Sequence, residues 1–272
     1  MKRILLGIIL CLIFTGVSYT QENKKINVAV TILPQVEFVK RVGGDRVRVT
    51  VMVPPGASPH TYEPKPSQLR EISKAKMYAK VGSGIEFELA WMDKIASINK
   101  KMLIVDCSKG IKLIDNDPHI WLSPRNVKIM VENIYQGLIK IDPVNKEYYR
   151  KNREKYLKKL DKLDEEITQV LSGMKNRKIM VYHPAWGYFC REYNLKQIPI
   201  EREGKKPTPQ GIASLIKEAE AKSGKIIFAS PQFSTKSAEV IAREIGGKVV
   251  LIDPLAENYL ENMRKVAKVF AR

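Results

Sequence analysis

The sequence predicts an α/β fold with two lobes, each a mostly parallel β-sheet flanked by helices, joined by one long backbone helix. Over most of the chain, short apolar runs alternate with longer amphipathic stretches, which is typical of βαβ units and parallel sheets. The alternation stops once, from about Asn145 to Leu171, where only helical periodicity remains. We therefore expect an N-terminal lobe over residues 21–142, a connecting helix within residues 143–174 and a C-terminal lobe over residues 175–272.

Each lobe contains four strand-like runs. The runs are five to seven residues long, rich in apolar and β-branched side chains, and separated by helical or turn signals. In the N-terminal lobe they are Ile26–Ile32, Val47–Val53, Met77–Val81 and Met102–Asp106. In the C-terminal lobe they are Lys178–Tyr182, Lys196–Ile200, Lys225–Ala229 and Lys248–Ile252.

Helix signals lie between these runs. The clearest helix start is Ser123, an N-cap residue followed by Pro124 at the first helical position, and this helix is expected to reach about Ile139. The break comes at Asp142 and Pro143. The other predicted helices are Gln35–Val42, Gln68–Lys74 and those beginning at Trp186, Thr208, Thr235 and Glu257.

The connecting helix is predicted by a long amphipathic repeat. About 27 residues at 1.5 Å per residue make it roughly 40 Å long, which is enough to span two lobes. Gly173 is expected to end it. The residues that recur at steps of three and four are Tyr149, Asn152, Tyr156, Leu160, Leu163, Ile167 and Val170.

The first twenty residues have the layout of a secretory signal. Lys2 and Arg3 precede the apolar stretch Ile4–Phe14, and small or polar residues lead to a cleavage site near Thr20. The apolar stretch is short for a transmembrane helix, although an uncleaved membrane anchor is the alternative. Cys11 lies inside this stretch, so there is no clear lipoprotein motif. We expect an exported, periplasmic protein.

The charge balance is strongly basic, with 47 Lys and Arg against 29 Asp and Glu and a formal net charge of +18. Nucleic-acid binding is one explanation of such a balance. In this chain, however, lysines alternate with acidic residues, as in KNREKYLKKLDKLDEE, and no basic run is interleaved with aromatic residues. We expect a solvated basic surface, no nucleic-acid partner and a monomer. The excess charge also suits an anionic membrane face or an acidic partner.

Two cysteines remain after the signal, Cys107 and Cys190. Neither has a partner at metal-binding spacing, and two cysteines do not make a disulfide framework. The sequence leaves a disulfide between them open.

The chain has only three histidines, and each lies among prolines or turn residues. His60 is in GASPHTYEPKP, His119 in DPHIWLSP and His183 in VYHPAWGYF. Asp253 directly follows the strand-like run Lys248–Ile252. Ligands gather at the carboxyl edge of open α/β sheets, so these four side chains are expected to face a shared cleft.

Three neutral imidazoles and one carboxylate form a complete tetrahedral set for zinc or a similar divalent ion. The flanking prolines would reduce the entropy lost when the metal binds. The alternative is that the histidines cap or pack the strand ends. Their spacing matches no compact metal motif such as HExxH, so the residues alone leave both interpretations open.

Several segments together resemble one family. They are VTILPQVEFVKRVGGDRVRVTVMVPPGASPHTYEPKPSQL, DPHIWLSPRN, VYHPAWGYFCREYNL, PQFSTKSAEVIAREIGGKVVLIDPLA and the long central helix, and they cover nearly the whole mature chain. The sequence is similar to the cluster A-I solute-binding proteins of ABC importers, the ZnuA/TroA-like family of zinc and manganese receptors. The resemblance implies two α/β lobes with a metal in the cleft, and an ABC permease and its ATPase as membrane partners.

The resemblance also implies a ligand set for Zn²⁺, with Mn²⁺ as the alternative. Manganese-preferring relatives use a glutamate from the loop after the third histidine position, which corresponds here to PIEREGKKPTP. Glu201 and Glu203 are expected to support the site or form salt bridges, and Glu203 is retained as an outside candidate ligand. The ligands of the family fall on His60, His119, His183 and Asp253 of this chain.

Neighbouring residues are expected to complete the site. Trp121 and Trp186 would wall it, a role that is compatible with packing in the core. Tyr62 and Glu63 would hydrogen-bond the second ring nitrogen of His60, as metal-bound histidines usually require, or have ordinary turn roles. The loop LIDNDPH is short, so the long histidine- and acid-rich loop of many zinc-binding members is absent.

Two other functions stay open at the level of sequence. If Asp253 were a general base, the three histidines would resemble the zinc site of a metallohydrolase. No nucleophile motif or oxyanion donor set accompanies them, so we expect a receptor and not an enzyme. Surface-anchored relatives also act as adhesins. The donor set favours zinc over manganese without deciding which metal is physiological.

Overall fold

The computed structural model describes residues 25–201, 210, 226–233 and 235–272 of the chain. The expected signal peptide, the expected helix start at Thr208 and the candidate ligand Glu203 lie outside the described residues. Within the described part, no helix is both long enough and apolar enough to cross a membrane.

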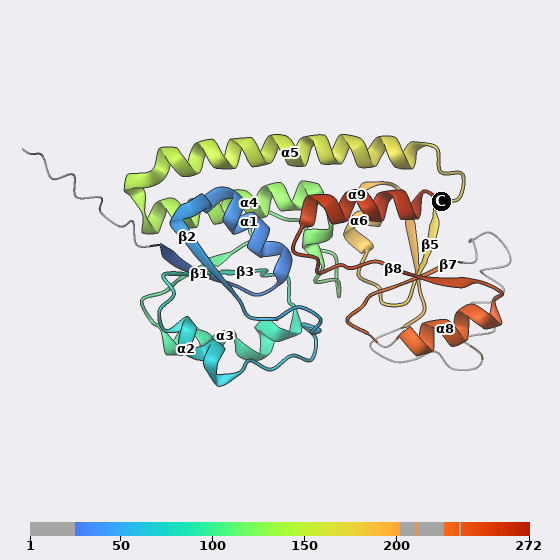
Figure 1. The fold of residues 1–272 in the computed structure, drawn as a ribbon, viewed down its shortest axis with the longest axis horizontal. Helices are drawn as coiled ribbons and strands as arrows, with labels where there is room; N and C mark the ends of the chain where they lie inside the picture. The colour runs from blue at the N-terminus through green and yellow to red at the C-terminus, as the bar shows by residue number, and fades with distance from the viewer. Residues whose placement is uncertain (1–24, 202–209, 211–225, 234) are drawn as a thin grey trace, which may run out of the picture.

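The described residues form two four-stranded sheets in which all paired strands are parallel (Figure 1). The first sheet has the order β2-β1-β3-β4 and the second the order β6-β5-β7-β8. All eight predicted strands are confirmed to within two residues. Their bounds are β1 Ile26–Val30, β2 Val47–Val51, β3 Met77–Lys80, β4 Leu103–Asp106, β5 Lys178–Val181, β6 Lys196–Pro199, β7 Ile226–Ala229 and β8 Lys248–Leu251.

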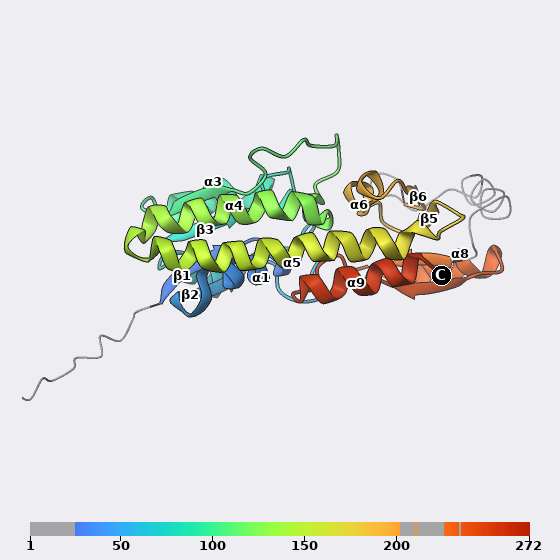
Figure 2. The same ribbon diagram turned by 90° about the horizontal axis from the view of Figure 1, so that it is seen from above.

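Helices cover both faces of each sheet (Figures 1 and 2). On β1, Val28 and Val30 face one hydrophobic core while Ala29 faces another on the opposite side. The strands are therefore apolar on both faces, as expected for parallel sheets. The helices beside them are α1 Leu33–Gly43, α2 Pro66–Ile72, α3 Glu86–Ile98, α4 Pro124–Ile141, α6 Gly187–Glu192, α8 Thr235–Glu244 and α9 Tyr259–Phe270, with short 3₁₀ turns at Gly44–Arg46, Ile120–Leu122 and Pro143–Asn145.

The connecting helix is α5, Lys146–Ser172, which is 27 residues long and is followed by Gly173. It runs along both lobes and packs against α4 and α1 of the first lobe and α9 of the second (Figures 1 and 2). Its buried residues, which include Tyr156 and Leu163, lie on the predicted face. The largest hydrophobic core contains these residues together with residues of both lobes, so the two lobes share one core.

Helix α4 begins as the sequence predicts. The Ser123 hydroxyl accepts a hydrogen bond from the Asn126 backbone N–H at 3.2 Å, and Pro124 occupies the first turn. Gly137 lets this helix approach the first sheet closely. A Cβ atom at Gly137 would lie 2.5 Å from Cγ2 of Val105 and 2.7 Å from Sδ of Met77.

We expect Gly137→Ala to destabilise the protein although alanine is the better helix former. The gain in helix propensity is about 1 kcal/mol, whereas overpacking a core costs about 1–3 kcal/mol. A net loss of about 1 kcal/mol lowers the melting temperature by about 2–4 °C, which thermal unfolding followed by circular dichroism would measure. Gly173→Ala is the control because its Cβ would have no neighbour within 4 Å. An unchanged or higher melting temperature for Gly137→Ala would contradict the packing argument.

Candidate metal centre

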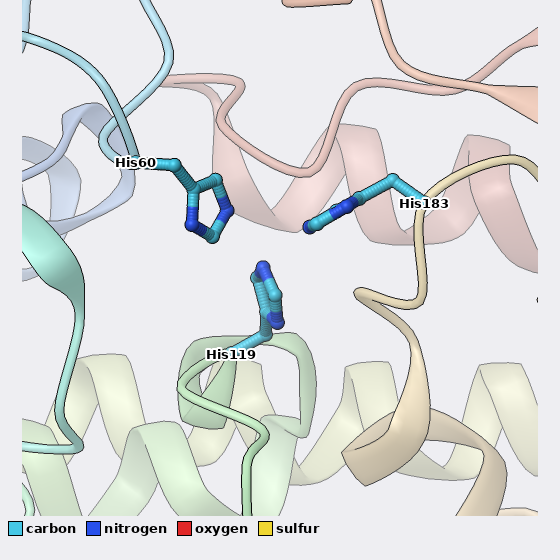
Figure 3. A group of neighbouring side chains, drawn as sticks. All are labelled: His60, His119 and His183. Atoms are coloured by element: carbon cyan, nitrogen blue, oxygen red, sulfur yellow. The ribbon is translucent and has the colours of Figure 1, made fainter. Parts of the chain in front are cut away.

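The three histidines, far apart in the sequence, converge between the lobes. One ring nitrogen from each of His60, His119 and His183 lies within 4.8 Å of the others. The ring centroids are 4.9 Å apart for His60 and His183, 5.3 Å for His119 and His183, and 5.7 Å for His60 and His119. Figure 3 shows the three rings pointing toward one another. This spacing fits three nitrogens around one metal ion.

Each histidine is presented by a loop at the end of a strand or the start of a helix. His60 lies between β2 and α2, His119 immediately precedes the 3₁₀ turn before α4, and His183 follows β5. The loop is held just before His60 by two hydrogen bonds: the His60 N–H donates to the Ser58 hydroxyl at 3.3 Å, and the Phe87 N–H donates to the Pro59 carbonyl at 3.0 Å. The first lobe supplies two of the rings and the second lobe supplies one.

A carboxylate stands beside Nδ1 of two histidines. Nδ1 of His60 lies 2.7 Å from Oε2 of Glu86, and Nδ1 of His119 lies 2.8 Å from Oδ1 of Asp117. An ionised carboxylate can only accept a hydrogen bond, so Nδ1 donates to it and Nε2 is the nitrogen left to bind a metal. This arrangement fixes the tautomer and orientation that a metal-bound histidine needs.

The third histidine is less well satisfied. Nδ1 of His183 lies 3.6 Å from Oε1 of Glu201, within ion-pair range but beyond a good hydrogen bond. Both ring nitrogens of His183 are buried without a hydrogen-bond partner among the described residues. A buried polar atom without a partner is costly, and a metal ion on Nε2 would remove part of that cost.

The protonation states of His119 and Glu86 favour the binding of a cation. Burial lowers the pKa of His119, against the opposing effect of its hydrogen bond to Asp117, so the ring is neutral at neutral pH. The hydrogen bond from His60 lowers the pKa of Glu86, against the opposing effect of burial, so Glu86 is ionised. Neutral imidazole and ionised carboxylate are the forms that metal binding requires.

Asp253 does not join the histidine cluster. Its Oδ1 accepts hydrogen bonds from Nε2 of Gln232 at 2.7 Å and from the Leu255 N–H at 2.8 Å. The following residue, Pro254, accepts a hydrogen bond from the Trp121 indole at 2.7 Å. A role for Asp253 as fourth ligand therefore stays a prediction.

The expected hydrogen bond from Tyr62 or Glu63 to His60 is wrong, and the alternative of an ordinary turn role holds, while Trp186 has the packing role that was expected beside a place in the wall of the site. Tyr62 donates its hydroxyl to Oε1 of Gln68 at 2.6 Å, and Glu63 is exposed, so Glu86 is the partner of His60. The ring contacts of Trp186 among the described residues are with Phe189 and Phe270 of the core and not with the histidines. The physical reason is that successive side chains of a loop point in different directions. A residue close to a histidine in sequence therefore need not lie beside its ring.

Two aromatic rings do border the cluster. The ring of Trp121 is centred 5.2 Å from His119, as expected. The ring of Phe233 is centred 4.7 Å from His183 and 6.3 Å from His60, and sequence reasoning missed it. Phe233 lies just after β7, at the same sheet edge as His183, and this position in the sequence could have identified it as a neighbour of the site.

The two cysteines, Cys107 and Cys190, are not part of the site. Cys107 and Cys190 are both free and buried, so they form no disulfide. Burial raises the pKa of Cys190 to about 12, so the thiol is neutral and unsuited to bind a metal. Among the residues that the structure describes, the three histidines are the only such group of possible metal ligands.

Comparison with known proteins agrees with this geometry. The family model described as ZnuA, zinc-uptake complex component A, periplasmic, matches residues 28–272. The chain belongs to this family. The family provides the binding component of an uptake complex, so the expectation of a receptor rather than an enzyme is confirmed.

Individual members of the family are similar over nearly the whole chain. The high-affinity zinc uptake system protein ZnuA of Bacillus subtilis is 30% identical over 264 residues, which cover 88% of this chain and 81% of that protein. A crystal structure of ZnuA matches with a TM-score of 0.87 and 42% identity, covering 91% of this chain and 98% of that one. A ZnuA deletion mutant with zinc bound matches with a TM-score of 0.85 and 42% identity, covering 91% and 97%. The predicted fold of two α/β lobes is confirmed.

We expect Glu86→Ala to weaken zinc binding about 10–100-fold, the usual effect of removing the carboxylate behind a metal-bound histidine. The loss follows because His60 would no longer be held in one tautomer and orientation. The control is Glu63→Ala, which removes an exposed carboxylate from the loop of His60 itself. Competition with a zinc chelator would give both dissociation constants. Equal affinities for the two variants would contradict the role of Glu86.

Proposed function

We propose that this protein is the extracytoplasmic receptor of a zinc importer, which captures Zn²⁺ between its lobes and passes it to a membrane permease driven by an ATPase. The observation that carries the proposal is the convergence of His60, His119 and His183 from both lobes. The relatives named for zinc uptake and the zinc-bound ZnuA structure support it. In this function the metal is the cargo, and the protein binds and releases it unchanged.

The donor chemistry favours zinc. Imidazole nitrogen suits Zn²⁺ well, whereas Mn²⁺ prefers oxygen donors. The histidine nitrogens bring no negative charge to the metal, so Glu86, Asp117 and the proposed ligand Asp253 would supply the carboxylates that balance its charge.

Asp253 is proposed as the fourth ligand. It lies in the segment after β8, at the carboxyl edge of the second sheet, and its Oδ1 is now held by Gln232 and Leu255. To reach a metal, the carboxylate would exchange the hydrogen bond from Gln232 for the metal ion. Glu201 is proposed to support His183, since the two are already within ion-pair distance.

The setting of the receptor is also proposed from the sequence. The expected signal peptide with cleavage near Thr20 would deliver the chain to the periplasm. We propose that it works there as a monomer with no nucleic-acid partner.

Titration of metal-stripped protein with Zn²⁺ should show one site per chain with an affinity tighter than micromolar. His119→Ala should weaken binding by orders of magnitude, because it removes a buried nitrogen ligand. Asp253→Ala should weaken it less, since three nitrogens remain. Calorimetry on all three proteins measures this, with unchanged melting temperatures of the metal-free variants as the control for folding. Wild-type affinity in His119→Ala would refute the site, and no tight binding at all would refute the receptor.

The physiological metal is tested separately. Elemental analysis of protein purified without added metal should find zinc. A strain lacking the protein should grow poorly under zinc limitation and normally under manganese limitation. The opposite growth defect would assign the protein to manganese.

A further inference from the structure

Part of the excess positive charge of the chain lies on the first half of one helix. The first half of α5, residues 146–159, contains seven Lys and Arg and two acidic residues. At 3.6 residues per turn, five lysines fall within an arc of about 100° and extend over about 16 Å of the helix. These five residues form what we call the α5 lysine stripe: Lys151, Lys155, Lys158, Lys159 and Lys162.

The stripe faces solvent. The core-facing residues of α5, among them Tyr149 and Leu160, lie on a different side of the helix. Four of the five lysines are exposed and Lys159 is half-buried. Helix α5 lies along one edge of the molecule, over both lobes (Figures 1 and 2). A flat object could therefore approach the stripe along its length.

Most acidic residues of α5 pair with residues other than the lysines of the stripe. Five of the six acidic residues of α5 are already paired, and their partners are mostly arginines. Among the described residues, no lysine of the stripe forms an ion pair. The paired acids are Glu147 with Arg150, Glu154 with Arg150 and Arg153, Asp161 with Lys128, Asp164 with Arg125, and Glu166 with Arg264.

The neighbouring helix α1 widens the positive surface. A groove of about 190 Å³ runs between α1 and α5, lined by Lys155 and Lys159 on one side and Lys40 and Arg41 on the other. Lys40 and Arg41 each have an acidic partner, so they add less charge than the stripe. The groove gives an anionic group a place to lie between cations from two helices.

We propose that the α5 lysine stripe and this groove bind the anionic phospholipid surface of a membrane. A straight row of lysines on a rigid helix matches a flat surface that carries many separate negative charges. Lysine provides point charges on flexible stems, whereas nucleic-acid recognition typically adds arginine forks and stacked aromatic rings. Since the stripe positions carry only lysine, the contact is electrostatic and does not insert into the bilayer.

This inference goes beyond zinc capture. The stripe shares no residue with the histidine cluster, so membrane adsorption and metal binding can be tested independently. Adsorption would keep the receptor close to the membrane in which its permease lies, and in this respect the inference rests on the proposed function. Each lysine near an anionic surface contributes about a fivefold gain in binding.

The test compares two triple variants with the same change in net charge. The first is Lys151→Gln, Lys155→Gln and Lys158→Gln, which removes the centre of the stripe and keeps good helix formers. The control is Lys94→Gln, Lys100→Gln and Lys101→Gln, three exposed lysines in or just after α3, on the opposite side of the first sheet from α5 (Figure 1). Co-sedimentation is measured with vesicles of equal phosphatidylglycerol and phosphatidylcholine, and with phosphatidylcholine alone.

Wild type and control should bind the anionic vesicles and be released by salt, while the stripe variant binds about 100-fold more weakly. The single variant Lys158→Gln should lose about fivefold. Zinc affinity and melting temperature of the stripe variant should equal those of wild type.

Three results would overturn the proposal. Equal losses in both triple variants would mean that net charge and not the stripe drives binding. Equal binding to phosphatidylcholine alone would exclude an electrostatic mechanism. Stripe-dependent retention on immobilised polyglutamate without binding to vesicles would point instead to an acidic protein surface.

Discussion

The buried face of α5 is the constraint on which the metal centre depends. Its residues join one hydrophobic core with residues of both lobes, such as Val28 of β1 and Phe270 of α9. Polar contacts between the lobes add to this, for example the Tyr259 N–H that donates to Oε2 of Glu37 at 2.6 Å. Because His183 comes from the opposite lobe, a shift of a few ångströms between the sheets would separate it from His60 and His119. A shared core leaves little room for such a shift.

The same constraint controls the groups behind the ligands. Asp117 holds His119 through Oδ1, while its Oδ2 lies against the start of α6 in the second lobe. A Cβ atom at Gly187 would be 2.2 Å from that oxygen, so only glycine leaves space for the carboxylate. The position of one histidine therefore depends on a close approach between the lobes that Gly187 allows.

Much of the fold and part of the site could be predicted from the sequence. The eight strands and the long helix follow from local periodicity, and the cap at Ser123 follows from the residue types at 123 and 124. The convergence of the histidines was expected because all three follow strands or precede helices at the ligand edge of a sheet. The contacts of Glu86 and Phe233 with the histidines were not predicted, because they depend on which loops meet at that edge.

The sequence by itself determined the period of each segment, the residues able to bind a metal and the strongly basic character of the surface. The tertiary structure decided the rest. It placed Glu86 rather than Glu63 beside His60 and turned Asp253 toward Gln232. Among the described residues it also left the α5 lysine stripe without ion pairs, while most acids of that helix paired with arginines. The reason is physical: periodicity depends on neighbours along the chain, whereas hydrogen bonds, ion pairs and metal ligation depend on ångström distances between segments that packing alone brings together.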